Sequence, residues 1–100
     1  MFRLIILWQL KEGIDPQPFI DALEAMPARV PSIKRAVASG DLGLTKQYGH
    51  NCSFSWVAEF EDQAGWAEYI ASPAHDEFAE MFMPACDQFL VNQWVVPAAD

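Results

Sequence analysis

The chain has 100 residues, of which 52 % are hydrophobic, and its 14 acidic and 6 basic side chains give a formal net charge of −8. One hundred residues suffice for one modest core and are too few for two, so we expect a single domain over residues 1–100. The negative charge repels nucleic-acid phosphates and anionic lipid headgroups, which argues against a nucleic-acid partner and a membrane partner.

The first predicted element is a β-strand over residues 2–10, FRLIILWQL. Leu4, Ile6 and Trp8 lie on one face of this strand and Leu7 lies on the other, so both faces are apolar and both should be covered. The apolar run is much shorter than a membrane span, and no basic leader precedes it. We therefore expect no signal peptide, no membrane anchor and a cytoplasmic location.

The first predicted helix has Asp15 as its N-cap and Pro16 at its first position. The helical pattern stops at Pro27. The apolar residues that recur at helical spacing, and so form one buried face, are Phe19, Ile20, Leu23 and Met26.

Two strands are then predicted on either side of a loop over residues 40–51, which contains three glycines. Residues 33–39 form a polar strand of the kind found at sheet edges. Residues 52–60, CSFSWVAEF, alternate strictly and form a strand with one aromatic face. That face carries Phe54, Trp56, Ala58 and Phe60.

The remaining chain predicts two helices and a last strand. Asp62 caps a short helix, and Ser72 followed by Pro73 opens another at once, which Pro84 ends or kinks. The last strand covers residues 89–96, and residues 97–100 are expected to be frayed. The expected buried residues of the two helices are Trp66, Tyr69, Ile70, Phe78, Met81, Phe82 and Ala85.

The order of elements is βαββαβ with a broken second helix, which predicts an α+β, ferredoxin-like fold: a four-stranded antiparallel sheet with both helices on one face. The other face would be bare, with Ile5, Leu7 and Val57 in a large apolar patch that isolated domains rarely tolerate. Two copies that pair these faces about a two-fold axis would cover both patches. We therefore expect a homodimer.

Three segments together resemble the stress-responsive A/B barrel (Dabb) family: LIILWQLKEG, FSWVAEFED and YIASPAHDEFAEMFMP. The resemblance spans nearly the whole chain in the right order. It implies a dimeric α/β barrel in which two sheets face each other, and many members are described as stress-responsive.

A plant polyketide cyclase of this family performs aldol-type cyclisation with a tyrosine and a histidine beside an internal pocket, and Tyr69 and His75 match those positions. The histidines usual in the first and third strands are Leu4 and Phe54 here, and the first histidine of the HPAH-like element is Ser72. The resemblance thus implies a more apolar pocket than that of the cyclase.

Tyr69 and His75 each have two interpretations from the sequence. Tyr69 is either a core aromatic whose hydroxyl finds a polar partner or an acid that polarises a substrate carbonyl. His75 is either a surface or capping histidine or a general base. The helix N-terminus disfavours its protonation, whereas Asp76 and Glu77 favour it.

The inward face of the sheet and helices is either a packed core or the lining of an apolar ligand cavity. The candidate lining residues are Leu4, Ile6, Trp8, Phe19, Leu23, Phe54, Trp56 and Phe78.

Cys52 and Cys86 are the only cysteines, and we expect both to be reduced, partly buried thiols. His50, the nearest base to Cys52, is more typical of a solvated loop. No spacing of His, Cys and carboxylates matches a zinc site, and no glycine motif would cradle a phosphate, so we predict no metal and no cofactor.

Three functions remain open. The first is a homodimeric stress-responsive protein that binds an apolar or aromatic small molecule in an internal cavity. The second is an acid–base enzyme, cyclase-like or lyase-like, that acts on a carbonyl compound through Tyr69 and His75. The third is a structural protein with a filled core. One fold hosts many functions, so the resemblance alone does not choose among them.

Overall fold

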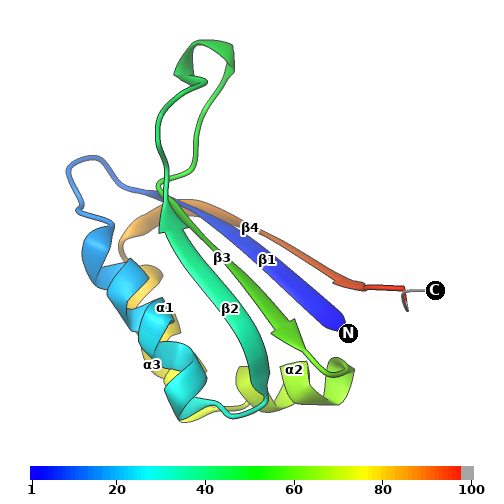
Figure 1. Ribbon diagram of the computed structural model, residues 1–100. Coiled ribbons are helices and arrows are strands. Elements are labelled where there is room, and N and C mark those ends of the chain that lie inside the picture. Colours follow the sequence, from blue (N-terminus) through cyan, green and yellow to red (C-terminus); the bar gives the residue numbers. More distant parts are fainter. Residues whose placement is uncertain (98–100) are drawn as a thin grey trace.

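Four strands form one antiparallel sheet, and the helices lie against one face of it (Figure 1). The computed structural model describes residues 1–97. The elements in chain order are β1 (Phe2–Leu10), α1 (Gln17–Arg29), β2 (Ile33–Gly40), a short 3-10 helix (Lys46–Tyr48), β3 (Phe54–Phe60), α2 (Gln63–Ile70), α3 (Pro73–Phe82) and β4 (Cys86–Val95). The strands lie in the order β2-β3-β1-β4. The ferredoxin-like βαββαβ prediction is confirmed, with the second helix divided into α2 and α3.

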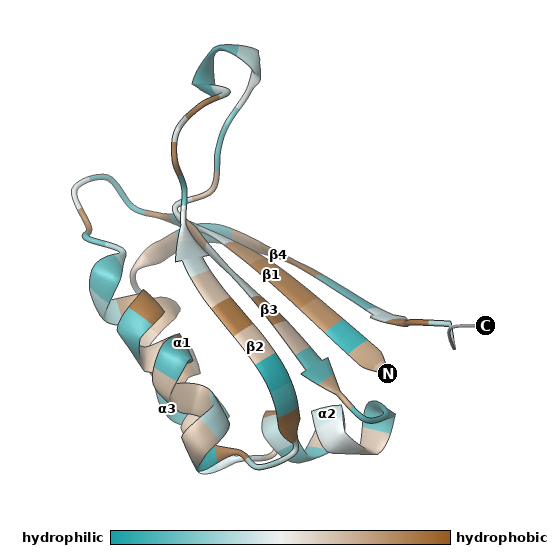
Figure 2. Ribbon diagram, viewed as in Figure 1, coloured by the Kyte–Doolittle hydropathy of each residue, from teal (hydrophilic) through white to brown (hydrophobic). Residues whose placement is uncertain are grey.

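The alternation of side chains along β1 and β3 decides which residues meet the helices. Leu4, Ile6 and Trp8 pair directly with Ala58, Trp56 and Phe54. All six side chains are buried, and each large apolar one contributes roughly 1.5–3 kcal/mol to stability when it leaves water. Figure 2 shows hydrophobic residues along most of β1, whereas hydrophobic and hydrophilic segments alternate along α1. The core therefore lies between the sheet and the helices.

The predicted caps of α2 and α3 are confirmed. The side chain of Asp62 accepts a hydrogen bond of 3.0 Å from the backbone N–H of Gly65, and Ser72 Oγ accepts one of 3.1 Å from His75. Each bond satisfies a donor that the first turn of a helix leaves free. α3 ends at Phe82, before Pro84.

The limits of α1 differ from the prediction at both ends. Pro16 occupies the N-cap position, and Asp15 instead accepts a hydrogen bond of 3.0 Å from the N–H of Gln17. The helix also continues through Pro27 to Arg29. The proline lacks the N–H that would bond four residues back, but the burial of Met26 and Val30 on either side of it stabilises the last turn.

Three smaller expectations are corrected. β4 begins at Cys86 rather than at residue 89, because its ladder with β1 extends across a bulge to the Leu10–Cys86 pair. β3 begins at Phe54 rather than at residue 52. Ile70 is 39 % exposed, although it was expected on the buried side of α2. Of the expected frayed tail, residues 98–100 lie outside the described residues.

The face of the sheet opposite the helices is uncovered over residues 1–97 (Figure 1). Val57 pairs with Ile5 on one side and with Val37 on the other, and Leu7 pairs with Leu90. Val37 and Leu90 are 55 % and 64 % exposed. These positions form an apolar stripe across all four strands, as the sequence predicted for β1 and β3.

Polar groups lie at one end of this stripe. The guanidinium of Arg3 pairs with Glu59 at 3.0 Å and lies 5.8 Å from the centre of the Trp94 ring.

In another part of the molecule, the connection between β2 and β3 projects away from the sheet (Figure 1). In residues 1–97, no helix has both the length and the hydropathy needed to cross a membrane.

Candidate functional site

A cavity of about 320 Å³ lies between the sheet and the pair α2 and α3. It follows the outer strand β4, where Phe89 and Val91 are 40 % and 43 % exposed, and the Phe82 ring of α3 meets Phe89 edge-to-face at 5.1 Å. Its walls are formed by Leu4, Ile6 and Trp8 of β1, Phe89, Val91 and Gln93 of β4, Trp66, Tyr69 and Ile70 of α2, and His75, Phe78, Ala79, Phe82 and Met83 of α3 and its end.

The register of the sheet explains why β1 and β4 share one wall. Trp8, Ile6 and Leu4 pair directly with Phe89, Val91 and Gln93, so all six side chains point to the helix face. Most of this wall is apolar, and Gln93 is the polar exception. The cavity is about twice the size of an engineered apolar cavity of roughly 150 Å³ that accepts benzene.

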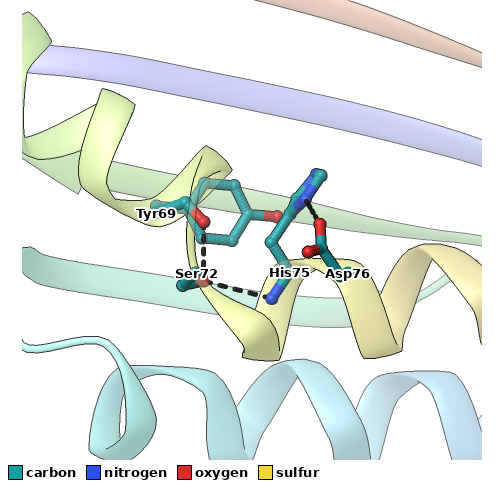
Figure 3. Close-up of polar contacts among 4 residues, drawn as sticks. All are labelled: Tyr69, Ser72, His75 and Asp76. Carbon is teal, nitrogen blue, oxygen red and sulfur yellow. Dashed lines mark hydrogen bonds and ion pairs between the residues drawn. The ribbon is translucent and has the colours of Figure 1, made fainter.

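Tyr69 and His75 meet at the cavity. Their ring centroids are 5.0 Å apart and their planes lie at 83°, an edge-to-face contact. Both residues line the cavity. Figure 3 shows the hydroxyl end of the Tyr69 ring directed toward the His75 side chain. The structure thus brings together the two residues predicted as an acid–base pair.

The turn at Ser72 fixes the approach of these two rings (Figure 3). Ser72 Oγ donates a hydrogen bond of 2.6 Å to the carbonyl of Tyr69 and accepts one of 3.1 Å from the N–H of His75. One hydroxyl therefore binds the last turn of α2 and the first turn of α3. Sequence spacing could not specify this geometry, because it depends on the angle between the two helices.

The two rings differ in their surroundings. Tyr69 is 2 % exposed, and burial raises the pKa of its phenol well above the ordinary value of 10.0. The phenol is therefore neutral at pH 7 and can donate a hydrogen bond. The His75 side chain is 26 % exposed, and its Nδ1 lies 3.4 Å from Asp76 Oδ1.

The eight predicted lining residues fall into two sets. Leu4, Ile6, Trp8 and Phe78 line the cavity. The other four lie in the packed core and not on the cavity wall: Phe19, Leu23, Phe54 and Trp56.

Ring stacking accounts for much of this packed core. The Phe54 ring stacks between Trp8 at 4.7 Å and Phe19 at 5.4 Å. Close packing of this kind fills the space between α1 and the sheet, and the cavity lies on the β4 side.

Sequence reasoning missed the contribution of β4 to the cavity. Phe89, Val91 and Gln93 occupy alternate positions of a strand that was itself predicted, so their common face was visible in the sequence. The missing information was that β4 pairs with β1, which places these residues beside Leu4, Ile6 and Trp8.

The two cysteines are free and partly buried, as expected. Burial raises the pKa of both thiols. A nearby carboxylate raises it further, that of Asp41 for Cys52 and that of Asp87 for Cys86. Both therefore stay protonated at pH 7, which disfavours a nucleophilic role. His50 lies exposed in the β2–β3 connection. Among residues 1–97, no group of three or more His, Cys, Asp and Glu side chains could hold a metal ion.

Comparison with known proteins gives consistent matches. Residues 2–96 match the family model of the stress responsive A/B barrel domain. The stress-response A/B barrel domain-containing protein HS1 of Arabidopsis thaliana is 28 % identical over 89 residues, which cover 87 % of this chain and 82 % of the relative.

Two solved structures share the fold over nearly their whole length. A dimeric ferredoxin-like protein of unknown function from Thermobifida fusca is 26 % identical with a TM-score of 0.82, over 95 % of this chain and 90 % of that chain. A hydroxynitrile lyase from Passiflora edulis is 20 % identical with a TM-score of 0.83, over 99 % and 95 % of the two chains.

Proposed function

Because this chain belongs to the stress-responsive A/B barrel domain family, we propose that it is a homodimer that binds an apolar or aromatic small molecule in the cavity beside β4. The observation that carries the proposal is the composition of the cavity: an apolar wall with a few polar groups, the usual form of a small-molecule site. Its volume of about 320 Å³ suits a single substituted aromatic ring.

The uncovered sheet face supports the proposed homodimer. Ile5, Leu7, Val37, Val57 and Leu90 would remain in contact with water in a monomer, and a second copy of the same face buries them in pairs. The similar protein from Thermobifida fusca is described as dimeric, which supports this arrangement. The cavity lies on the opposite side of the sheet, so each copy retains its own.

Filling the cavity tests ligand binding. Ala79 lines the cavity from α3, and Ala79→Phe would place a ring inside it. We expect acetophenone and 4-methylphenol to raise the melting temperature of the unmodified protein, because a ligand that binds only the folded state stabilises it by about 2.7 kcal/mol at one hundred times its dissociation constant. Ala79→Phe should abolish this increase, as should Val91→Phe on the opposite wall.

Ala28→Phe is the matched control, since Ala28 is exposed on α1 away from the cavity. It should retain the full increase. The proposal is wrong if neither compound stabilises the unmodified protein, or if both cavity-filling variants fold and respond to the compounds as the control does.

The contact between Tyr69 and His75 favours a second candidate, an acid–base enzyme that acts on a carbonyl compound. The neutral phenol can donate to a carbonyl oxygen while the imidazole takes a proton from the adjacent carbon, and reversal returns both protons. The Passiflora edulis lyase is an enzyme with a similar fold, although 20 % identity supports likeness of fold alone.

Hydrogen–deuterium exchange tests this chemistry directly. In deuterated buffer, an enzyme of this kind should speed exchange of the methyl protons of acetophenone, which NMR follows. Tyr69→Phe and His75→Ala should each lower the rate at least about 100-fold, the range typical of general acid–base groups. Tyr48→Phe, in the exposed β2–β3 connection, is the control for the tyrosine change. Full exchange in both site variants would exclude this candidate.

A further inference from the structure

The polar groups of the cavity carry no permanent charge. Its lining residues include Tyr69, His75 and Gln93 but no Asp, Glu, Lys or Arg. The phenol of Tyr69 is neutral and the Gln93 amide does not ionise, which leaves His75 as the one lining side chain that can become positive. At the polar part of the wall, a ligand would therefore meet two neutral hydrogen-bonding groups, those of Tyr69 and Gln93, beside the His75 ring.

We infer that the cavity selects neutral oxygenated aromatic compounds over the corresponding carboxylates, and that Gln93 recognises the oxygen-bearing group of the ligand. This inference rests on the proposed function and names the ligand class of the same cavity. It also gives a specific role to a residue of β4.

The position of Gln93 suits this role. It pairs with Leu4 across the β1–β4 ladder, so its side chain points to the helix face, and it lies in the cavity wall together with Tyr69 and His75. Its amide offers one acceptor and two donors, so it can bind a hydroxyl or a carbonyl group. The neighbouring positions on this wall, Val91 and Leu4, offer the ligand only apolar contact.

A carboxylate would bind poorly in the same place. Moving an ionised carboxylate into an apolar site is costly unless a positive group pairs with it. Only His75 could do so, and Asp76 Oδ1 already lies 3.4 Å from its Nδ1. The chain as a whole has a formal net charge of −8, so the surrounding field repels anions as well.

A series of ligands that share one ring tests the inference. Toluene, benzyl alcohol, benzaldehyde and benzoate are titrated by NMR into the unmodified protein at pH 7.5. We expect benzoate to bind at least about 100-fold more weakly than benzyl alcohol. In Gln93→Leu, affinity for benzyl alcohol and benzaldehyde should fall about three- to tenfold, the effect of one lost hydrogen bond, while affinity for toluene stays the same or rises.

Gln63→Leu is the control, because Gln63 is exposed at the start of α2 and does not line the cavity. It should change none of these affinities. Benzoate binding as tightly as benzyl alcohol would overturn the selection for neutral ligands, and equal losses for toluene and benzyl alcohol in Gln93→Leu would overturn the role of Gln93. If toluene and all its congeners fail to bind the unmodified protein, the proposed function itself is wrong and this inference falls with it.

Discussion

Tyr69 shows how one side chain can serve both the core and the cavity. Its ring centroid lies 5.4 Å from that of Trp56 and 5.8 Å from that of Phe60, both of which belong to the fully buried face of β3. Its ring also makes an edge-to-face contact with the His75 ring beside the cavity. The two interpretations that the sequence left open, core aromatic and functional phenol, are therefore compatible in space.

The raised pKa of Tyr69 predicts a loss of stability at alkaline pH. Below about pH 10 the phenol is protonated in both states, so it adds no pH dependence. Above that pH the unfolded state releases the proton and the folded state keeps it, so the free energy of unfolding falls by up to about 1.4 kcal/mol per pH unit. The stability that the neutral phenol provides is thus complete below pH 10 and lost above it.

Urea denaturation between pH 9 and pH 11.5 measures this effect. Tyr69→Phe should show a shallower decline than the unmodified protein, whereas Tyr48→Phe should not. Cys52 and Cys86 also have raised pKa values and add a decline of the same sign, but they are common to all three proteins and cancel in the comparison. An identical decline in Tyr69→Phe and the unmodified protein would contradict the prediction.

At the scale of elements, sequence patterns correctly predicted the features that depend on residues close together in the chain. The alternation of β1 and β3 identified the buried faces, and the caps at Asp62 and Ser72 located the starts of α2 and α3. The helix and strand boundaries that were predicted wrongly depend on contacts between elements. α1 passes Pro27 because its last turn packs on the core, and β4 begins early because β1 extends the ladder to Cys86.

The candidate site was predictable only in part, for a related reason. The Tyr69–His75 pair came from a resemblance, and Ser72 was identified as a cap without indicating that it also binds the carbonyl of Tyr69. The cavity walls depend on which strand lies beside which. Residues of one predicted strand, such as Phe54 and Trp56, proved to be core, whereas Phe89 and Gln93 of another proved to be lining.

At the scale of the whole molecule, the helices are too few to cover the sheet. α1 and α3 pack beside each other on one face, β4 is left partly open on that face, and the opposite face has no cover within residues 1–97 (Figure 1). The partly open region at β4 contains the cavity, and the uncovered opposite face forms the proposed interface. Both sites, on opposite sides of one sheet, thus exist because the helices leave part of the sheet uncovered.

The proposed interface predicts the effect of a charge at its centre. Leu7 lies on the uncovered face beside Leu90 and Ser55, and a two-fold axis would bring two copies of Leu7→Asp into each dimer. Burying an unpaired carboxylate costs several kcal/mol, so we expect the dimer dissociation constant to rise at least about 1,000-fold, equivalent to about 4 kcal/mol. Sedimentation velocity between 1 and 100 µM measures it, with circular dichroism to show that the variant is folded.

Ala64→Asp, which places the same charge on the exposed first turn of α2, should leave the dimer intact. Val57→Asp, at the neighbouring strand, should act as Leu7→Asp does, so a folding defect of one variant does not decide the result. Because each cavity lies on the far side of its own sheet, a folded Leu7→Asp monomer should still bind benzyl alcohol. A monomeric unmodified protein at micromolar concentration would refute the interface, and strands β1 and β3 would then need a different cover.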